Sequence, residues 1–139
     1  MKGEVMKFLN RMALATVLTL VPGLVGAWTA QNHHKVAFVS DTVFEVVGRP
    51  GSAGQEYWCA AGEFARNVVG ASAVQRVHLV RGPAVAQTSN WNRAVLFSLT
   101  PPQNGNVRPR ITLSVSRVGD NMSAAMAESY CRPDLVEGP

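Results

Sequence analysis

Apolar and polar positions along the chain predict two strands, a long helix, three more strands and a short helix. β-Branched and aromatic residues dominate segments 35–40 and 42–47, which predict a strand pair joined by a turn. The stretch from Gln55 to about Gly70 has apolar residues at helical spacing, namely Tyr57, Ala61, Phe64, Ala65 and Val68. We therefore expect a long amphipathic helix that Ser52 or Gly54 caps and Gly70 ends.

The second half of the chain predicts strands over residues 75–80, with an extension toward 86, over 93–100 and over 110–118. In 110–118, apolar residues alternate with polar ones, and this strand should form a long-looped hairpin with 93–100. A short helix is expected at about 123–131. The order ββ-α-βββ-α predicts an α+β fold, a two-layer sandwich with an antiparallel sheet of four or five strands.

The N-terminus has the features of a secretory signal peptide. Three cations precede an apolar run over residues 12–21, and residues 25–27 (Val-Gly-Ala) are a suitable cleavage site. We expect residues 1–27 to be removed, which leaves one domain at 28–139 in the periplasm or secreted. The alternative is an uncleaved helix that makes the protein a membrane-anchored accessory subunit, although a proline and a glycine interrupt the apolar segment.

Charge and composition do not favour a nucleic acid, a cofactor or a metal as partner. The 139-residue chain carries a net charge of +4, of which the signal segment contributes +2. The arginines are scattered and form no basic run, so we expect no nucleic-acid binding. The neighbours His33 and His34 do not converge on one ion, and we expect them in a solvated leader over residues 28–34. The N-terminal signal segment is the one part of the chain that we expect to contact a membrane.

The two cysteines, Cys59 and Cys131, predict one disulfide in an oxidising compartment. On a helical wheel Cys59 lies opposite the apolar stripe, so the bridge should leave the outer flank of the long helix and hold the C-terminal segment. The alternative is a small cysteine-dependent hydrolase with Cys59 as nucleophile and His78, expected as a surface or interfacial imidazole, as base. Because a partner cysteine is present and no orienting carboxylate is in evidence, we expect no catalytic residue.

The glycine- and proline-rich loop at residues 48–54 is the best candidate for a ligand site. Arg49, Gly51, Ser52 and Gly54 could offer free backbone N–H groups and a positive charge to an anion beside the helix start. The alternative is an ordinary connection between strand and helix, because no phosphate-binding pattern matches. We expect an exported, non-enzymatic domain that binds a small anionic ligand or a periplasmic protein partner.

Two short stretches resemble a segment of small uncharacterised exported proteins of alphaproteobacteria. They are residues 44–51 (FEVVGRPG) and residues 57–63 (YWCAAGE). The resemblance implies export and a bacterial origin, and it implies no activity and no site residue.

Overall fold

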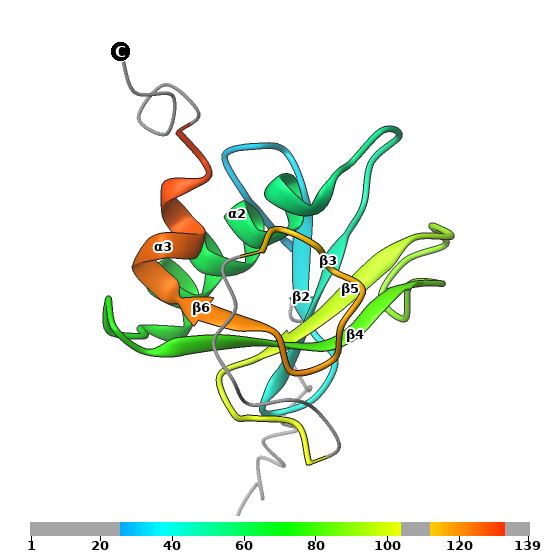
Figure 1. Ribbon diagram of the computed structural model, residues 1–139. Helices are drawn as coiled ribbons and strands as arrows, with labels where there is room; N and C mark the ends of the chain where they lie inside the picture. The colour runs from blue at the N-terminus through cyan, green and yellow to red at the C-terminus, as the bar shows by residue number, and fades with distance from the viewer. Residues whose placement is uncertain (1–25, 104–111, 133–139) are drawn as a thin grey trace, which may run out of the picture.

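The computed structural model describes residues 26–103 and 112–132, which form a six-stranded antiparallel sheet with two helices on one face (Figure 1). This architecture confirms the predicted α+β class. The sheet has the order β1-β2-β3-β5-β4-β6. The strands are β1 (Trp28–Thr29), β2 (Lys35–Phe38), β3 (Val43–Val47), β4 (Arg76–Ala84), β5 (Ala94–Ser98) and β6 (Asn121–Ser123). The helices are α2 (Gly54–Phe64) and α3 (Ala124–Ser129).

The described sheet has six strands instead of four or five, in part because residues 28–34 form a hairpin. The expectation of a solvated leader was wrong. Trp28 pairs with Val36 of β2, and its ring packs edge-on against Phe64 with 5.8 Å between the ring centroids. His33 turns the chain in the left-handed region, with a φ of 68°. The hairpin therefore belongs to the folded domain.

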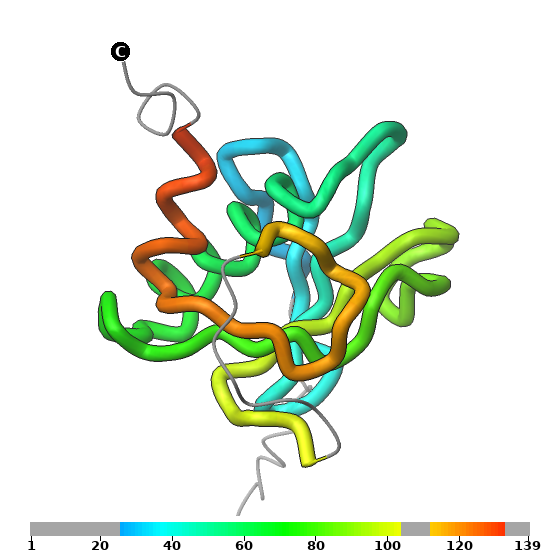
Figure 2. The backbone as a smooth tube through the Cα atoms, viewed as in Figure 1, coloured from blue at the N-terminus to red at the C-terminus, as the bar shows by residue number. Residues whose placement is uncertain are grey.

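The predicted strand over 110–118 is wrong where the structure describes it, because residues 112–118 pair with no strand. Residues 110 and 111 lie outside the described residues. The expected hairpin with 93–100 is also wrong, since β5 forms its hairpin with β4, whose other edge pairs with β6. Figure 2 shows residues 112–120 arching from the side of α2 to β4.

Hydroxyl groups explain why the segment after residue 111 is not a strand. Thr112 Oγ1 accepts a hydrogen bond from Ser114 N at 3.2 Å, and Ser114 Oγ accepts one from Ser116 N at 3.3 Å. Such local bonds compete with a strand ladder. Trp58 Nε1 donates to Ser114 O at 3.4 Å, and Val115 is buried. The alternation thus predicted the burial of Val115 between the exposed Ser114 and Ser116, but not the hydrogen-bond partners of the backbone.

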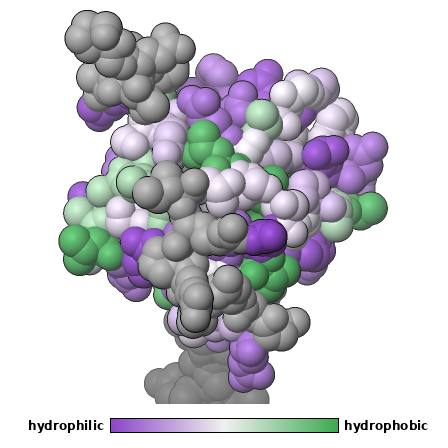
Figure 3. Space-filling view, in the orientation of Figure 1, coloured by the Kyte–Doolittle hydropathy of each residue, from purple (hydrophilic) through white to green (hydrophobic). Residues whose placement is uncertain are grey.

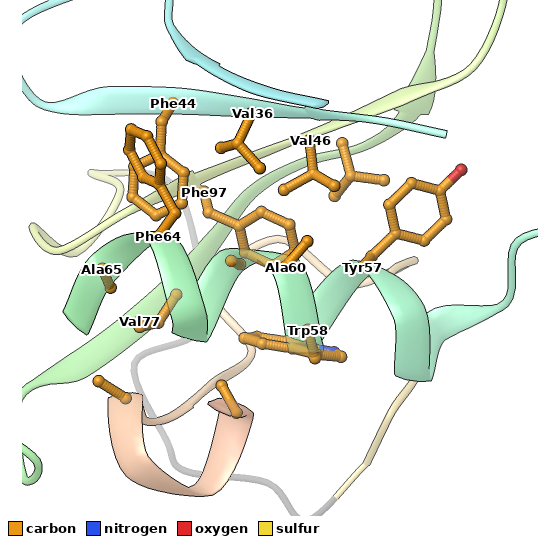
Figure 4. Close-up of a cluster of buried hydrophobic side chains, with 14 of the residues drawn as sticks. Val36, Phe44, Val46, Tyr57, Trp58, Ala60, Phe64, Ala65, Val77 and Phe97 are labelled. Carbon is orange, nitrogen blue, oxygen red and sulfur yellow. The ribbon is translucent and has the colours of Figure 1, made fainter. Parts of the chain in front are cut away.

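The core lies between α2 and the sheet. Figure 4 shows Phe44 and Phe97 from the sheet facing Trp58 and Phe64 of the helix. The rings of Trp58 and Phe97 are 4.9 Å apart, and those of Phe44 and Phe64 are also 4.9 Å apart. All four side chains are buried. Of these four residues, only Phe64 belongs to the predicted apolar stripe. The aromatic area that all four bury stabilises the contact between α2 and the sheet.

The long helix ends in a wider turn than the periodicity indicates. Residues Ala65–Val69 form a π-helical turn, which changes the number of residues per turn. Val68 therefore leaves the apolar stripe and is 42% exposed, so its predicted burial was wrong. Gly70, with a φ of 80°, ends the helix as expected, and Ala71 N donates to Ala65 O at 2.8 Å.

The predicted disulfide between Cys59 and Cys131 is present and connects α2 to the chain just after α3. Cys59 is only 1% exposed, so it does not lie on an outer flank as expected. The reason is that α3 covers this side of α2, which the helical wheel of α2 alone does not show. A disulfide indicates an oxidising compartment outside the cytoplasm. Neither helix of the described part has the length and apolar content needed to cross a bilayer.

The contact between α2 and α3 depends on Gly62. A Cβ atom at this position would lie 2.6 Å from the Cβ of Ala127 and would overlap the backbone nitrogen of Glu128. Glycine lets the two helices approach closely, and this approach brings Cys131 near Cys59. The helix interior usually favours alanine over glycine by about 1 kcal/mol, so a packing requirement outweighs helix propensity here.

We expect Gly62→Ala to lower the free energy of unfolding by about 1–3 kcal/mol, because the added methyl group forces α3 away. Urea denaturation measures this change. Asn67→Ala is the matched control, since Asn67 is exposed and should change stability by less than about 0.5 kcal/mol. A Gly62→Ala protein more stable than the wild type would show that α3 is not held at this distance.

Candidate functional site

A hollow of about 400 Å³ opens to solvent where the β1–β2 hairpin, loop 48–54 and the start of α2 meet. The residues that line it are mostly polar: Asn32, His34, Arg49, Pro50, Gly51, Ser52 and Glu56. Three of the four predicted loop residues are among them. The fourth, Gly54, packs instead against the carbonyl group of Leu113, which leaves no space for a side chain.

His34 and Ser52 form the closest side-chain contact in this hollow. Ser52 Oγ lies 2.7 Å from His34 Nε2 and accepts a hydrogen bond from Arg49 N at 2.8 Å. His34 Nδ1 lies 3.2 Å from the carbonyl oxygen of Asn32. His34 is 3% exposed and Ser52 is partly exposed, so the hydroxyl group lies between a buried imidazole and the solvent.

These contacts define the tautomer of neutral His34. A carbonyl oxygen only accepts hydrogen bonds, so Nδ1 must carry the proton that Asn32 O receives. Nε2 is then unprotonated and accepts the hydroxyl proton of Ser52. The arrangement places a base on a hydroxyl group and a third group that orients the base, which is the pattern of an activated nucleophile.

Burial lowers the pKa of His34 from its usual 6.5. The positive charge of Arg49 acts in the same direction, whereas the hydrogen bond to Asn32 and the carboxylate of Glu56 act against it. The net effect is a lower pKa, which keeps the imidazole neutral at pH 7. A neutral imidazole is the form that can accept a proton from Ser52.

The helix start itself is already satisfied. The Glu56 carboxylate accepts a hydrogen bond from Ala53 N at 3.0 Å, and Ala53 occupies the N-cap position. The expectation that Ser52 or Gly54 caps the helix was wrong, because the Ser52 hydroxyl binds His34 and Arg49 N instead. Any anion in the hollow would therefore depend on the Arg49 side chain and would lie near the negative charge of Glu56.

Cys59 and His78 are not brought together. Cys59 lies between the two helices, and the disulfide leaves it no thiol. The expectation of a surface or interfacial imidazole at His78 was wrong: it is 5% exposed, on the sheet face away from the helices, although its strand register was correct. The proposed cysteine hydrolase thus lacks its nucleophile while the disulfide is closed.

Among the described residues, one group of side chains has the spacing of metal ligands. Cys59, Glu63 and Cys131 place their ligand atoms within 4.8 Å of one another. Both sulfur atoms are bonded to each other in the disulfide, so neither is a thiolate that could bind a metal ion. The group is a disulfide with a neighbouring carboxylate.

Glu45 is a buried acid that the sequence analysis did not single out. It is 0% exposed and lies on the sheet face away from the helices. Its carboxylate accepts hydrogen bonds from Gln87 N at 2.8 Å and 3.0 Å, from Thr88 N at 3.0 Å and from Thr88 Oγ1 at 2.7 Å. Arg81 lies 3.9 Å away. Because its oxygens are occupied, Glu45 holds the loop between β4 and β5 and is not a free acid or base.

A second concave region, the apolar corner, is lined by Phe38, Asp41, Thr42, Phe44, Val69, Leu99 and Thr100. Its volume is about 130 Å³, and Phe38 and Val69 at its rim are 37% and 38% exposed. The face shown in Figure 3 has only small, separated hydrophobic patches outside the part that grey atoms cover. The apolar corner is lined mainly by the apolar side chains of Phe38, Phe44, Val69 and Leu99, and we assign it no chemistry.

Asp120 is a buried acid with an unfavourable environment. It is 1% exposed, and neither carboxylate oxygen has a hydrogen-bond partner in the described structure. Burial raises its pKa from 3.8, and the charge of Arg117 only partly opposes this. The folded state therefore favours the protonated form, and this contribution to stability is present below pH 3.8 and lost as the pH rises through the folded-state pKa.

We expect Asp120→Asn to raise the free energy of unfolding at pH 7 by about 1 kcal/mol, because it removes a buried charge. At pH 3 the carboxyl group is neutral in both states, so the gain should disappear. Denaturation of wild type and variant at both pH values measures this, with the exposed Asp41→Asn as control. An equal gain at both pH values would show that the charge of Asp120 is not the cause.

Comparison of the chain with protein-family models, with curated proteins and with solved structures gives no match. The site must therefore be interpreted from its own geometry. The resemblance of residues 44–51 and 57–63 to exported alphaproteobacterial proteins stays a prediction.

The sequence pointed to Ser52 and Arg49 through the loop composition, but it gave His34 the wrong environment. Nothing in the local pattern links His34 to a loop 18 residues away. For Glu45 a signal did exist, because a single acid stands within the apolar strand FEVV. A charge in such a strand is expected to have buried partners or a function.

Proposed function

We propose that the protein is an exported domain that binds a small carboxylate-bearing ligand in the hollow beside His34 and Ser52. The observation that carries this proposal is the polar lining of that hollow, where Arg49 and Glu56 flank a hydrogen-bonded His34–Ser52 pair. Convergent polar groups in an open concave region are typical of ligand sites. We propose no catalytic role for the cysteines.

The charges of the hollow narrow the ligand chemistry. Arg49 is exposed and can pair with a carboxylate, which favours the predicted anionic ligand. Glu56 brings a negative charge to the same hollow, which disfavours a bare anion and favours a ligand with an ammonium group on its other side. A small zwitterion such as an amino acid or a peptide terminus satisfies both charges.

A titration with glycine and, separately, with acetate tests this proposal by NMR of the backbone amides. We expect saturable shifts at His34 and at residues 49–52, with glycine binding more tightly than acetate. Arg49→Ala should weaken glycine binding about tenfold, which corresponds to 1.4 kcal/mol. Arg132→Ala removes an exposed arginine elsewhere and should bind as the wild type does. Shifts that are absent for both probes, or equal in the two variants, would contradict the proposal.

Export rests on two features. The disulfide supports an oxidising compartment, and the basic and apolar N-terminal segment supports removal of residues 1–27. Trp28, which would become the first residue, is also the first residue of the sheet. N-terminal sequencing of protein from the periplasm or medium should begin at Trp28. A sequence that begins at Met1 in the membrane fraction would instead favour the anchored accessory subunit.

The alternative that the sequence leaves open is a domain that binds a periplasmic protein partner. The surface on which it would depend is the apolar corner around Phe38 and Val69. The polar hollow brings together Arg49, Glu56 and the His34–Ser52 pair, so we propose a small ligand in preference to a protein partner.

A further inference from the structure

We infer that Ser52 is an activated nucleophile that can be acylated by small carboxylic esters, with His34 as its general base. This inference rests on the proposed function, because it assigns a reaction to the same hollow. It depends on the hydrogen bond between Ser52 Oγ and His34 Nε2, at 2.7 Å, and on the orientation that Asn32 O gives to the imidazole.

The position of the hydroxyl group supports a reaction and not only a contact. The hydrogen bond from Arg49 N, at 2.8 Å, fixes the oxygen without using its proton. The proton is therefore directed to Nε2. The other lone pair of Ser52 Oγ is the one that can attack an ester, and Ser52 lines an open hollow. Ser52 is partly exposed, whereas His34 is buried, so an ester can reach the nucleophile while the base stays protected from bulk water.

The reaction is balanced without a cofactor. Ser52 Oγ attacks the ester carbonyl carbon while its proton moves to His34 Nε2, and a bond forms between Oγ and the acyl carbon. The bond to the alkoxy oxygen then breaks, and that oxygen leaves with the proton from Nε2. Water, with His34 again as base, releases the acid and restores the hydroxyl group.

Arg49 lines the same hollow and offers a positive charge to the negative oxygen of the intermediate. Glu56 lines the hollow as well, so an ester with an ammonium group has a partner beside the reacting carbonyl.

Acylation of the full chain by p-nitrophenyl acetate tests this inference. When the reaction is stopped with acid during turnover, mass spectrometry of peptides from the wild-type protein should find one acetyl group on Ser52 and none on Ser40. Ser40 is an exposed serine whose Oγ also accepts backbone N–H groups but has no histidine. This readout needs no variant, so it does not depend on whether a variant folds.

The variants define the role of each side chain. We expect Ser52→Ala and His34→Gln to slow nitrophenol release about 100-fold, and Ser40→Ala to leave it unchanged. The wild-type rate should rise with pH through the titration of His34. No acetyl group on Ser52, or the same acetylation rate in His34→Gln, would overturn the inference. Saturable glycine binding with an unreactive Ser52 would contradict only this inference and leave the proposed ligand site in place.

Discussion

Replacement of both cysteines, Cys59→Ser with Cys131→Ser, should lower the free energy of unfolding by about 4 kcal/mol. The bridge closes a loop with a sequence separation of 72 residues, which restricts the unfolded chain strongly in the chain-entropy model. Domains of this size have a total stability of about 5–15 kcal/mol, so the loss is a large part of the total. Both cysteines are replaced together because a single free thiol could form dimers.

Urea denaturation with and without dithiothreitol measures this effect. The reductant should shift the midpoint of the wild type toward that of the double variant, and it should leave the double variant unchanged. Because α3 packs on α2 through Gly62 and Ala127, residues 124–132 should lose protection from hydrogen exchange first. Equal midpoints of the oxidised and reduced wild type would contradict a stabilising disulfide.

Glu45→Ala should cause the second large loss, about 3 kcal/mol of unfolding free energy. The substitution removes the hydrogen bonds that Gln87 N, Thr88 N and Thr88 Oγ1 donate to the carboxylate, and a hydrogen bond to a charged group contributes about 1.5–3 kcal/mol. Because residues 87 and 88 are exposed, water replaces part of this contribution. Glu45→Gln keeps one acceptor oxygen and should lose less. Hydrogen exchange at residues 87 and 88 should accelerate in both variants, more so in Glu45→Ala.

Glu128→Ala is the matched control for the Glu45 variants. Glu128 pairs with Arg66 at 3.5 Å, and both side chains are about one third exposed, at 32% and 34%. Exposed pairs contribute at most about 1 kcal/mol. If Glu45→Ala and Glu128→Ala cost the same, Glu45 does not hold the β4–β5 loop in the way that its hydrogen bonds indicate.

The sequence predicted the fold class because local patterns sufficed for most elements. The apolar stripe from Tyr57 to Phe64 was enough for α2, and the even cysteine count was enough for the disulfide. The strand at 110–118 failed because alternation reports side-chain burial and not backbone pairing. β1 was missed because a two-residue strand carries no readable period.

The site was only half predictable for a similar reason. Loop composition pointed to Arg49 and Ser52, which do line the hollow. His34 was placed in solvent because its burial depends on the β1–β2 turn and on a loop after β3. Contacts between segments far apart in sequence leave no mark in either segment alone.

The tautomer of His34 tests the role of Ser52 most directly, because Ser52 can act as a nucleophile only if Nε2 of His34 accepts its proton. Long-range ¹H–¹⁵N NMR of the imidazole at pH 7 distinguishes the two nitrogens. We predict a neutral ring with the proton on Nδ1, donated to Asn32 O, and an unprotonated Nε2 that accepts from Ser52. A proton on Nε2 would contradict the account, because Ser52 would then accept that hydrogen bond and its own proton would have no base.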